Sequence, residues 1–250
     1  MERRGQCIAV VSGKGGTGKT SFTAGVSAAL AQSGKRVLCL DCDVGLRNLD
    51  LALGLSDRAL MDFSDVAQNR CPLAAAVVEH PHLPGLFLLT APVRSRGRPA
   101  TEEQMAKLLR DIRERFDYCL LDAPAGLGMG FLLATAAADR CVVVTTTDAS
   151  SLRDAQHTVM ELERFGTGKL HLVVNRVRKK MLRSMHATID DAIDKAGLPL
   201  IGVVPEDDAL PLALNRGTPV LLSPGTPAAE AYRNIAKRIQ GIRAPLMRVK

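Results

Sequence analysis

The sequence contains few aromatic residues: Phe, Tyr and Trp make up 3% of its 250 residues, and Trp is absent. Because proteins that bind single-stranded nucleic acids stack bases on aromatic side chains, this composition argues against that mode of action. No apolar stretch approaches the roughly 18 residues that a membrane-spanning helix needs. The polar start, MERRGQ, precedes only a short strand-like run, so no secretory signal peptide is expected. We therefore expect a cytoplasmic protein.

The sequence also lacks the two cysteine pairs of a structural zinc site. Cys39 and Cys42 match the C-x-x-C pattern, which can indicate redox or metal chemistry. The same segment must also hold Asp41 and Asp43, which argues against that interpretation. Most of the cysteines lie in apolar runs, where a thiol behaves as a small hydrophobic group. The six cysteines are Cys7, Cys39, Cys42, Cys71, Cys119 and Cys141.

Acidic residues are outnumbered by basic ones, and the formal net charge is +7 with a pI near 9.3. An excess of positive charge favours a polyanionic partner, such as nucleic acid, an anionic lipid surface or a phosphorylated ligand. It fits an Arg-rich soluble protein without such a partner equally well. Basic residues cluster at residues 94–98 and 175–183. Each cluster is either a contact for phosphate or lipid or an ordinary solvated face.

Short apolar runs alternate with longer amphipathic segments along the whole chain. The runs are nearly continuous, which is typical of strands buried on both faces. The predicted strands are residues 7–11, 36–41, 86–90, 117–122, 140–146, 170–175 and 199–205. The predicted helices are residues 19–32, 102–115, 130–138, 151–165, 182–196 and 228–240. This order predicts an α/β fold with a mostly parallel, twisted sheet of about seven or eight strands and helices on both faces.

A glycine-rich loop connects the first predicted strand to the first predicted helix. Gly13, Gly18, Lys19 and Thr20 match the pattern G-x-x-x-x-G-K-[ST] of a P-loop NTPase. In such a loop, backbone N–H groups and the helix N-terminus surround phosphate oxygens. Lys19 would contact the β- and γ-phosphates, and the Thr20 hydroxyl would bind Mg²⁺. The predicted nucleotide-binding residues of the loop are Gly13, Gly15, Gly16, Thr17, Gly18, Lys19, Thr20 and Ser21.

A second lysine, Lys14, stands near the start of the same loop. On its spacing alone, it is either a solvated surface lysine or a residue that points outward to the phosphates of a facing protomer. In the second case the lysine would couple dimerisation to the triphosphate state and would supply charge to the transition state, as arginine fingers do.

Acidic residues follow two of the predicted strands. Asp41 and Asp43 end the second run, and Asp122 ends the fourth. The C-terminal end of a strand faces the ligand crevice in open α/β sheets, where a carboxylate can hold a metal ion through water or order an attacking water. The alternative for Asp41 and Asp43 is an ordinary strand-end cap. Asp122 has the position of a Walker B acid, and the glycine-rich residues 123–128 after it could sense the γ-phosphate.

Together these segments resemble the MinD/ParA group of ATPases, whose P-loop carries its signature lysine where Lys14 stands. KGGTGKT (14–20), DCDVGLRNLDLALG (41–54) and DAPAGLG (122–128) carry the resemblance, and the second is very similar to the same region of MinD proteins. Further similar stretches lie at residues 150–155, 173–176, 201–207, 214–220 and 231–239. The set follows the same order over nearly the whole chain, which makes it specific.

The resemblance implies a role for each part of the site. Lys14 would contact the partner's nucleotide in an ATP-dependent homodimer, Asp43 would position the attacking water, and Asp41 would support Mg²⁺. The predicted catalytic residues are therefore Lys14, Lys19 and Asp43. The predicted metal-binding residues are Thr20, Asp41 and Asp122. The predicted adenine-binding residues are Asn175, Pro205, Glu206 and Asp207. The expected ligands are ATP or ADP and Mg²⁺.

By the same resemblance, we expect a MinD-like ATPase that dimerises with ATP and acts in division-site placement. It would hydrolyse ATP to ADP and phosphate with weak intrinsic activity, which a division-regulator protein would stimulate. The alternative is a ParA-like ATPase or a flagellar-number regulator whose ATP dimer binds DNA or a protein partner. An amide-forming synthetase would need a second substrate pocket, for which no motif is found. A reductase of the nitrogenase iron-protein type would carry its cysteines in glycine-rich loops, whereas Cys119 and Cys141 fall in predicted strands.

The end of the chain departs from the family pattern. MinD proteins usually end in an amphipathic helix that inserts into the bilayer, whereas here the last helical segment belongs to the predicted ATPase domain, residues 1–241. Only a short basic tail, residues 242–250, remains, and Pro245 disfavours a helix through it. Its three cations are Arg243, Arg248 and Lys250. We expect at most a weak, peripheral association with the inner face of the cell membrane, dependent on ATP, anionic lipid and low salt.

Overall fold

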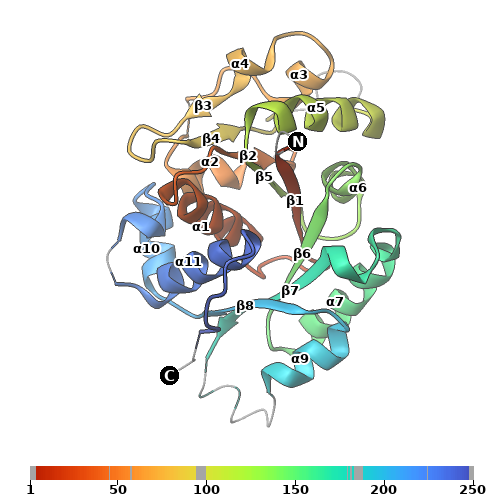
Figure 1. The fold of residues 1–250 in the computed structure, drawn as a ribbon, viewed down its shortest axis with the longest axis vertical. Helices are drawn as coiled ribbons and strands as arrows, with labels where there is room; N and C mark the ends of the chain where they lie inside the picture. The colour runs from red at the N-terminus through yellow and green to blue at the C-terminus, as the bar shows by residue number, and fades with distance from the viewer. Residues whose placement is uncertain are drawn as a thin grey trace.

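The computed structural model describes residues 4–44, 46–56, 58–93, 100–178, 180, 182, 188–223 and 225–247. Within them, the chain forms one eight-stranded sheet in the order β3-β4-β2-β5-β1-β6-β7-β8 (Figure 1). All neighbouring strands are parallel except β3 and β4. The strands are β1 (Gln6–Val11), β2 (Val37–Asp41), β3 (Val78–Glu79), β4 (Leu86–Leu89), β5 (Tyr118–Asp122), β6 (Arg140–Thr145), β7 (Leu170–Val177) and β8 (Leu200–Pro205).

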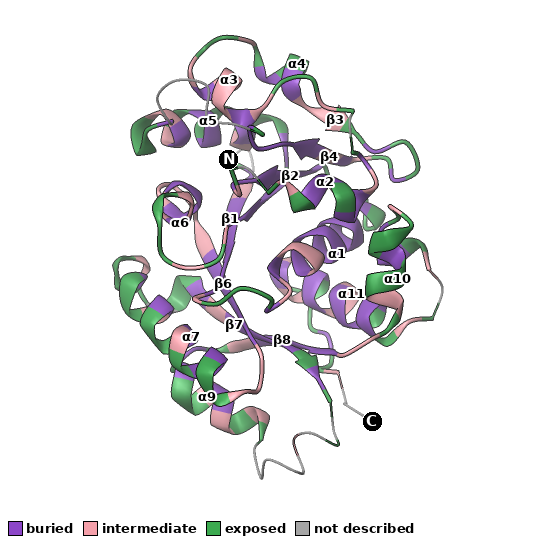
Figure 2. Ribbon diagram, turned by 180° about the vertical axis from the view of Figure 1, so that it is seen from behind, coloured by how far each residue is buried: buried purple, intermediate pink, exposed green. Residues whose placement is uncertain are grey.

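Helices cover both faces of this sheet (Figure 2). One face carries α1 (Lys19–Gln32), α2 (Asn48–Leu53), α10 (Ala209–Asn215) and α11 (Pro227–Ile239). The other carries α3 (Phe63–Ala67), α4 (Leu73–Ala76), α5 (Glu102–Arg115), α6 (Met129–Thr135), α7 (Ala149–Glu161) and α9 (Ile189–Ala196). Short 3₁₀ helices are η1 (Glu163–Phe165), η2 (Thr167–Lys169) and η3 (Val220–Leu222). The α/β fold that the sequence predicts is confirmed.

The continuous apolar pattern of the strands follows from this double cover. In β1, Cys7, Ala9 and Val11 pack into the core on one face of the sheet, while Ile8 and Val10 pack into the core on the other. Because successive side chains of a strand point to opposite faces, a strand buried on both sides has no position for a polar residue. Polar residues are displaced to the strand ends, where the ligand crevice lies.

Some element bounds differ from the predicted ones. The helices at 19–32 and 102–115 have the predicted bounds, but the predicted helix at 151–165 ends at Glu161 and continues as a 3₁₀ turn. The predicted helix at 182–196 is described from Ile189 onward. The two-residue edge strand β3 and the short helices α2, α3, α4 and α10 were not predicted, because four to seven residues carry too little periodicity. Among the described residues, no helix has the length and apolarity to cross a bilayer.

The first helix and the last helix pack tightly against each other. The ring of Tyr232 on α11 is fully buried and lies edge-to-face on Phe22 of α1, with 6.1 Å between ring centroids. This approach is possible because Gly25 stands opposite the ring: a Cβ atom there would lie 2.2 Å from Cδ2 of Tyr232. The helix that starts at the phosphate loop is thereby fixed to α11, the last helix among the described residues.

We expect Gly25→Ala to lower the free energy of unfolding by about 1–3 kcal/mol, because the added methyl group overpacks the interface with Tyr232. The loss should occur although alanine favours a helix interior by about 1 kcal/mol over glycine. Urea denaturation measures it. Gly168→Ala is the control, since a Cβ at Gly168 meets no atom within 4 Å. A Gly25→Ala protein as stable as the wild type would show that the two helices are not packed this closely.

Candidate functional site

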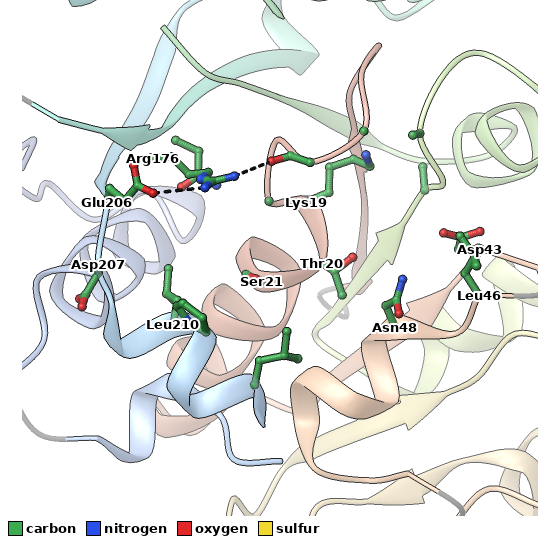
Figure 3. A pocket seen from close by; sticks show the side chains of 18 of the residues that line it. Lys19, Thr20, Ser21, Asp43, Leu46, Asn48, Arg176, Glu206, Asp207 and Leu210 are labelled. Carbon is green, nitrogen blue, oxygen red and sulfur yellow. Dashed lines mark hydrogen bonds and ion pairs between the residues drawn. The ribbon is translucent and has the colours of Figure 1, made fainter. Parts of the chain in front are cut away.

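The carboxyl ends of the parallel strands meet at one edge of the sheet, beside the loop between β1 and α1. A cavity of about 480 Å³ opens there (Figure 3). The loop and the start of α1 form one wall. The segment after β2, the end of β7 and the segment after β8 form the others. The lining includes Gly15, Gly16, Gly18, Lys19, Thr20, Ser21, Asp43, Asn175, Glu206 and Asp207. The structure thus brings together most of the residues that the sequence predicts for nucleotide binding.

Gly13 and Gly18, the first and last glycines of the motif, must be glycine for different structural reasons. Gly18 has a φ of +88°, which L side chains rarely adopt, and a Cβ there would lie 2.3 Å from Nδ2 of Asn175. Gly13 allows the loop to approach α7: a Cβ there would lie 2.5 Å from the carbonyl oxygen of Asp154. Gly13 is therefore a packing residue that sets the position of the loop, and it does not line the cavity.

The ammonium group of Lys19 lies inside the site. The residue is only 7% exposed, and Nζ donates a hydrogen bond to Oγ of Ser12 at 2.7 Å. Burial lowers the pKa of Lys19, whereas the nearby carboxylates of Asp122 and Asp43 raise it. Oγ of Ser12 in turn donates to the carbonyl oxygen of Lys14 at 2.7 Å, so the same serine positions the lysine and the loop.

Asp41 and Asp122 stand opposite each other at the ends of β2 and β5. Burial, followed by the charge of Asp122, raises the pKa of Asp41 to about 7. Burial likewise raises the pKa of Asp122 to about 6, although the hydroxyl of Thr20 and the ammonium of Lys19 stabilise its charged form. Oγ1 of Thr23 donates to Oδ1 of Asp122 at 3.2 Å. The fully buried Asp41 lies behind the cavity and organises the next loop.

That loop carries Asp43. Asp41 accepts hydrogen bonds from the backbone N–H of Asp43 at 2.8 Å and of Leu49 at 3.3 Å, and so fixes both ends of the turn before α2. Asp43 itself faces the cavity. Burial raises the pKa of Asp43, and the charge of Lys19 opposes that shift. A carboxylate at this position can accept a proton or a hydrogen bond from a group beside Lys19.

Asn175, at the end of β7, supports the loop from the other side. Its Nδ2 donates to the carbonyl oxygen of Thr17 at 2.7 Å, and its buried Oδ1 has no hydrogen-bond partner among the described residues. Glu206 and Asp207 line the same part of the cavity, directly after β8. Asp207 also accepts from the backbone N–H groups of Ala209 at 2.9 Å and Ala228 at 3.0 Å, so it joins α10 to α11. Pro205 ends β8 behind them and does not line the cavity.

Lys14 lies on the opposite side of the loop from Lys19. Its side chain is 44% exposed, and Nζ donates to Oγ of Ser150 at 2.7 Å and approaches Oδ1 of Asp148 at 3.4 Å. Lys14 and Asp148 border a second cavity of about 420 Å³. Partial burial opposes ionisation of Asp148, but hydrogen bonds from Thr146, Ser150 and Ser151 hold its pKa below the usual range. Both lysines therefore belong to one loop and face two different cavities.

The cysteines fit the structural interpretation. Cys39 and Cys42 are fully buried, and burial raises the pKa of Cys39 to about 12 and that of Cys42 well above its ordinary value. Such thiols stay protonated, so they are poor nucleophiles and metal ligands. Cys119 and Cys141 lie buried inside β5 and β6, as predicted. Within the described ranges, no group of three or more His, Cys, Asp or Glu residues is arranged to hold a metal ion.

Several residues of the site were missed by sequence reasoning. Ser12 precedes the motif and carries no signal of its own. Asp148 and Ser150 lie far along the chain from Lys14, so only the fold brings them together. Arg176 was placed in the basic cluster at 175–183 and in the family-like stretch at 173–176 without a role of its own, yet it lines both cavities. The basic residues 94–98 lie outside the described residues.

Comparison with known proteins agrees with this geometry. Residues 8–220 match the family of CobQ/CobB/MinD/ParA nucleotide binding domains. The septum site-determining protein MinD of a Synechocystis strain is 40% identical over 247 residues, which span 96% of this chain and 91% of the relative.

Two solved structures extend the likeness to three dimensions. The Aquifex aeolicus MinC:MinD cell division protein complex holds a chain that is 36% identical, with a TM-score of 0.89 over 98% of this chain and 99% of that one. Pyrococcus horikoshii MinD complexed with Mg-ADP is 28% identical, with a TM-score of 0.82 over 94% and 95% of the two chains. This chain therefore belongs to the CobQ/CobB/MinD/ParA family of nucleotide-binding domains, within its MinD/ParA group of P-loop ATPases.

Proposed function

We propose that this chain is a MinD-like ATPase that binds ATP in the 480 Å³ cavity, associates into a dimer in the ATP state and contributes to division-site placement. The observation that carries the proposal is the placement of the two lysines. Lys19 is buried among the site carboxylates, whereas Lys14 stands half-exposed on the other side of the same loop. One loop can thereby contact its own nucleotide with Lys19 and present Lys14 to a second copy.

The geometry of the cavity favours adenine as the base. The hydrogen bond to Thr17 sets the orientation of the Asn175 amide, and its Oδ1 is buried and lacks a partner among the described residues, so we propose that it accepts from the base when a nucleotide is bound. The amino group of adenine is a donor, whereas guanine has a carbonyl oxygen at the same position. The Mg-ADP bound to the Pyrococcus relative supports an adenine nucleotide. Glu206 and Asp207 would border the base.

The residues present also fit a magnesium ion held largely through water. The Thr20 hydroxyl would be a direct ligand, and the carboxylates of Asp122 and Asp41 would hold bound water, which suits a cation that keeps part of its hydration shell. When bound, Mg²⁺ would neutralise charge on the β- and γ-phosphate oxygens. Burial raises the pKa of both carboxyl groups and so favours their neutral forms. A nearby cation would oppose that shift by favouring their charged forms.

Hydrolysis then depends on three side chains of this chain. Lys19, fixed by Ser12, would hold the phosphates in place and offset their charge. Asp43 lines the cavity near Lys19 and would order the attacking water. Lys14 of a second copy would add positive charge to the transition state, which only the dimer can provide. This last dependence would account for the weak hydrolysis that we expect of a single copy and for stimulation by partners that favour the active dimer.

A protein partner fits the same proposal. The Aquifex relative was solved as a MinC:MinD complex, which supports a division-regulator partner for this chain. The ATP-dependent dimer would present a surface that a single copy does not have. Binding of such a partner would thereby depend on the nucleotide.

We expect substitution of the two lysines to separate nucleotide binding from dimerisation. Lys19→Ala should weaken ADP binding about 10- to 100-fold, since hydrogen bonds to charged groups contribute about 1.5–3 kcal/mol. Lys14→Ala should bind ADP nearly as the wild type does but should neither dimerise with ATP nor hydrolyse it. Titration calorimetry and size-exclusion chromatography with light scattering, in ADP and in a slowly hydrolysed ATP analogue, measure the two effects. Lys195→Ala, on an exposed face of α9, is the control. Normal dimerisation and turnover of Lys14→Ala would refute its cross-dimer role.

Asp43→Ala should still bind ATP but should hydrolyse it about 10²- to 10⁴-fold more slowly, because the attacking water is no longer ordered. The ATP-bound dimer should accumulate, which light scattering detects together with a phosphate-release assay. Asp190→Ala, an exposed aspartate on α9, should hydrolyse ATP at the wild-type rate. The role assigned to Asp43 is wrong if its alanine variant turns over normally.

The segment after α11 limits what can reach a membrane. Nε of Arg238 donates to the carbonyl oxygen of Ala244 at 3.0 Å, and Met247 packs against the core. Ile242 and Leu246 are 52% and 41% exposed. The other predicted tail residues, 248–250, lie outside the described residues. The described part of the tail is therefore tied to α11 and offers few apolar side chains for insertion.

We expect weak membrane association that requires ATP, anionic lipid and low salt, because two tails of a dimer act together while salt screens their cations. Sedimentation with vesicles of phosphatidylglycerol or phosphatidylcholine measures it, in ATP analogue and in ADP. Arg243→Ala should reduce sedimentation with anionic vesicles. Tight binding to neutral vesicles, or equal binding in ADP, would contradict this expectation.

A further inference from the structure

The end of β7 contains an irregularity that directs two consecutive side chains to the phosphate loop. Val174 pairs with Val203 and Val177 with Pro205, so two residues of β7 stand opposite one residue of β8. This is a bulge, which is rare between parallel strands and is a common way to re-aim a side chain near a functional site. Arg176, within the bulge, has a φ of +56°, a conformation that costs a non-glycine residue about 1–3 kcal/mol.

The bulge has a specific result. In a regular strand, neighbouring side chains point to opposite faces. Here Nδ2 of Asn175 donates to the carbonyl oxygen of Thr17 at 2.7 Å, and Nη1 of Arg176 donates to the carbonyl oxygen of Gly16 at 3.1 Å. Two adjacent residues thus hold two adjacent carbonyl groups of the loop. The strained backbone of Arg176 is what allows the second of these contacts.

The same guanidinium group also holds the segment after β8. Nη2 of Arg176 donates to Oε1 of Glu206 at 3.2 Å, and Nε of Arg178 donates to Oε2 at 2.5 Å. Although partial burial opposes it, the hydrogen bonds from the two arginines lower the pKa of Glu206, so the carboxylate stays charged near neutral pH. The backbone N–H of Glu206 also donates to the carbonyl oxygen of Val177 at 3.1 Å. Arg176 is the member of this cluster that reaches the phosphate loop.

Arg176 stands at the boundary between the two cavities. Gly16, Arg176 and Glu206 line both the nucleotide cavity and the cavity beside Lys14. In Figure 3 the guanidinium group lies between the loop and Glu206, with a contact to each. The loop is the phosphate side of the cavity, and the segment that starts at Glu206 is the side assigned to the base. A single side chain therefore connects the two walls between which a nucleotide would lie.

We propose that Arg176 is a positioning residue that clasps the nucleotide site closed, joining the phosphate loop at Gly16 to Glu206 and thereby slowing release of the bound nucleotide. This inference rests on the proposed nucleotide site and adds to it the residue that controls how long the ligand stays. Arg176 acts through the two walls and needs no contact with the ligand. Lysine cannot replace it well, because an ammonium group is a point charge that cannot bridge both acceptors in the planar geometry of a guanidinium group.

The test measures the release rate of a fluorescent ADP analogue from the full chain, chased with excess ADP. Arg176→Ala should release the analogue about tenfold faster. Loss of a fully buried hydrogen bond to a charged group would give a larger factor, but the Arg176 side chain is half-exposed. Arg178→Ala is the matched control: it removes an arginine from the same Glu206 but leaves the link to Gly16, so its rate should stay within about twofold of the wild type. Arg176→Lys should behave more like Arg176→Ala than like the wild type.

Two further readouts separate a clasp from a general contribution to stability. Arg176→Gly removes the side chain and also the backbone strain, so it should release the analogue as fast as Arg176→Ala while its Tm is no lower than that of the wild type. Release from the wild type should accelerate between low and high salt, because the half-exposed ion pair is screened, and release from Arg176→Ala should change less.

The outcomes distinguish this inference from the proposed function. If the wild type does not bind the ADP analogue, the nucleotide site itself is wrong. If the wild type binds it and Arg176→Ala and Arg176→Gly release it at the wild-type rate, the clasp is refuted while the site stands. Equal acceleration by Arg178→Ala would also refute the clasp, since it would show a general effect of charge near Glu206.

Discussion

The burial of one positive charge sets the arrangement of the site. Taking the ammonium group of Lys19 out of water is costly unless hydrogen bonds and opposite charges replace the lost hydration. Ser12 supplies the hydrogen bond, and the carboxylates of Asp43 and Asp122 supply the charge. Those carboxyl groups are shifted toward their neutral forms by the same burial. Phosphate oxygens and a divalent cation would stabilise the charged form of every member, so the loop, the end of β2 and the end of β5 are best understood as one electrostatic unit.

The parts of this unit that the sequence predicts are those that depend on local pattern. A run of apolar residues buried on both faces identifies β1, β2 and β5, and the residue after each run lies at the ligand edge because parallel strands end there together. The start of α1 follows from the motif, since Gly18 and Lys19 are adjacent in sequence. Placing Asp41 and Asp122 at the ligand edge required no knowledge of the tertiary structure beyond a parallel sheet. Their register pairing was nevertheless visible only in the structure.

The parts that the sequence did not predict depend on contacts between distant segments. Ser150 and Asp148 became partners of Lys14 because α7 packs beside the phosphate loop, at a distance that Gly13 permits. The bulge at Arg176 has no composition signal, because it arises from the mismatch in register between β7 and β8. The motif predicts that Gly13 binds phosphate, and the structure adds a packing reason for a glycine there, because a Cβ would meet Asp154. Residue spacing therefore identified the ligand class, and only the fold showed how the site is held together.

The central place of β1 has a consequence for the order of assembly. This strand is synthesised before the other described strands, yet its two neighbours in the sheet, β5 and β6, come from far along the chain. Contacts of that kind form slowly, because a long loop must be closed before they contribute. Until Asp122 has been synthesised, Lys19 lacks that carboxylate, and until β6 has followed, β1 lacks its second neighbour in the sheet. A nascent chain thus carries the complete signature motif long before it carries a binding site.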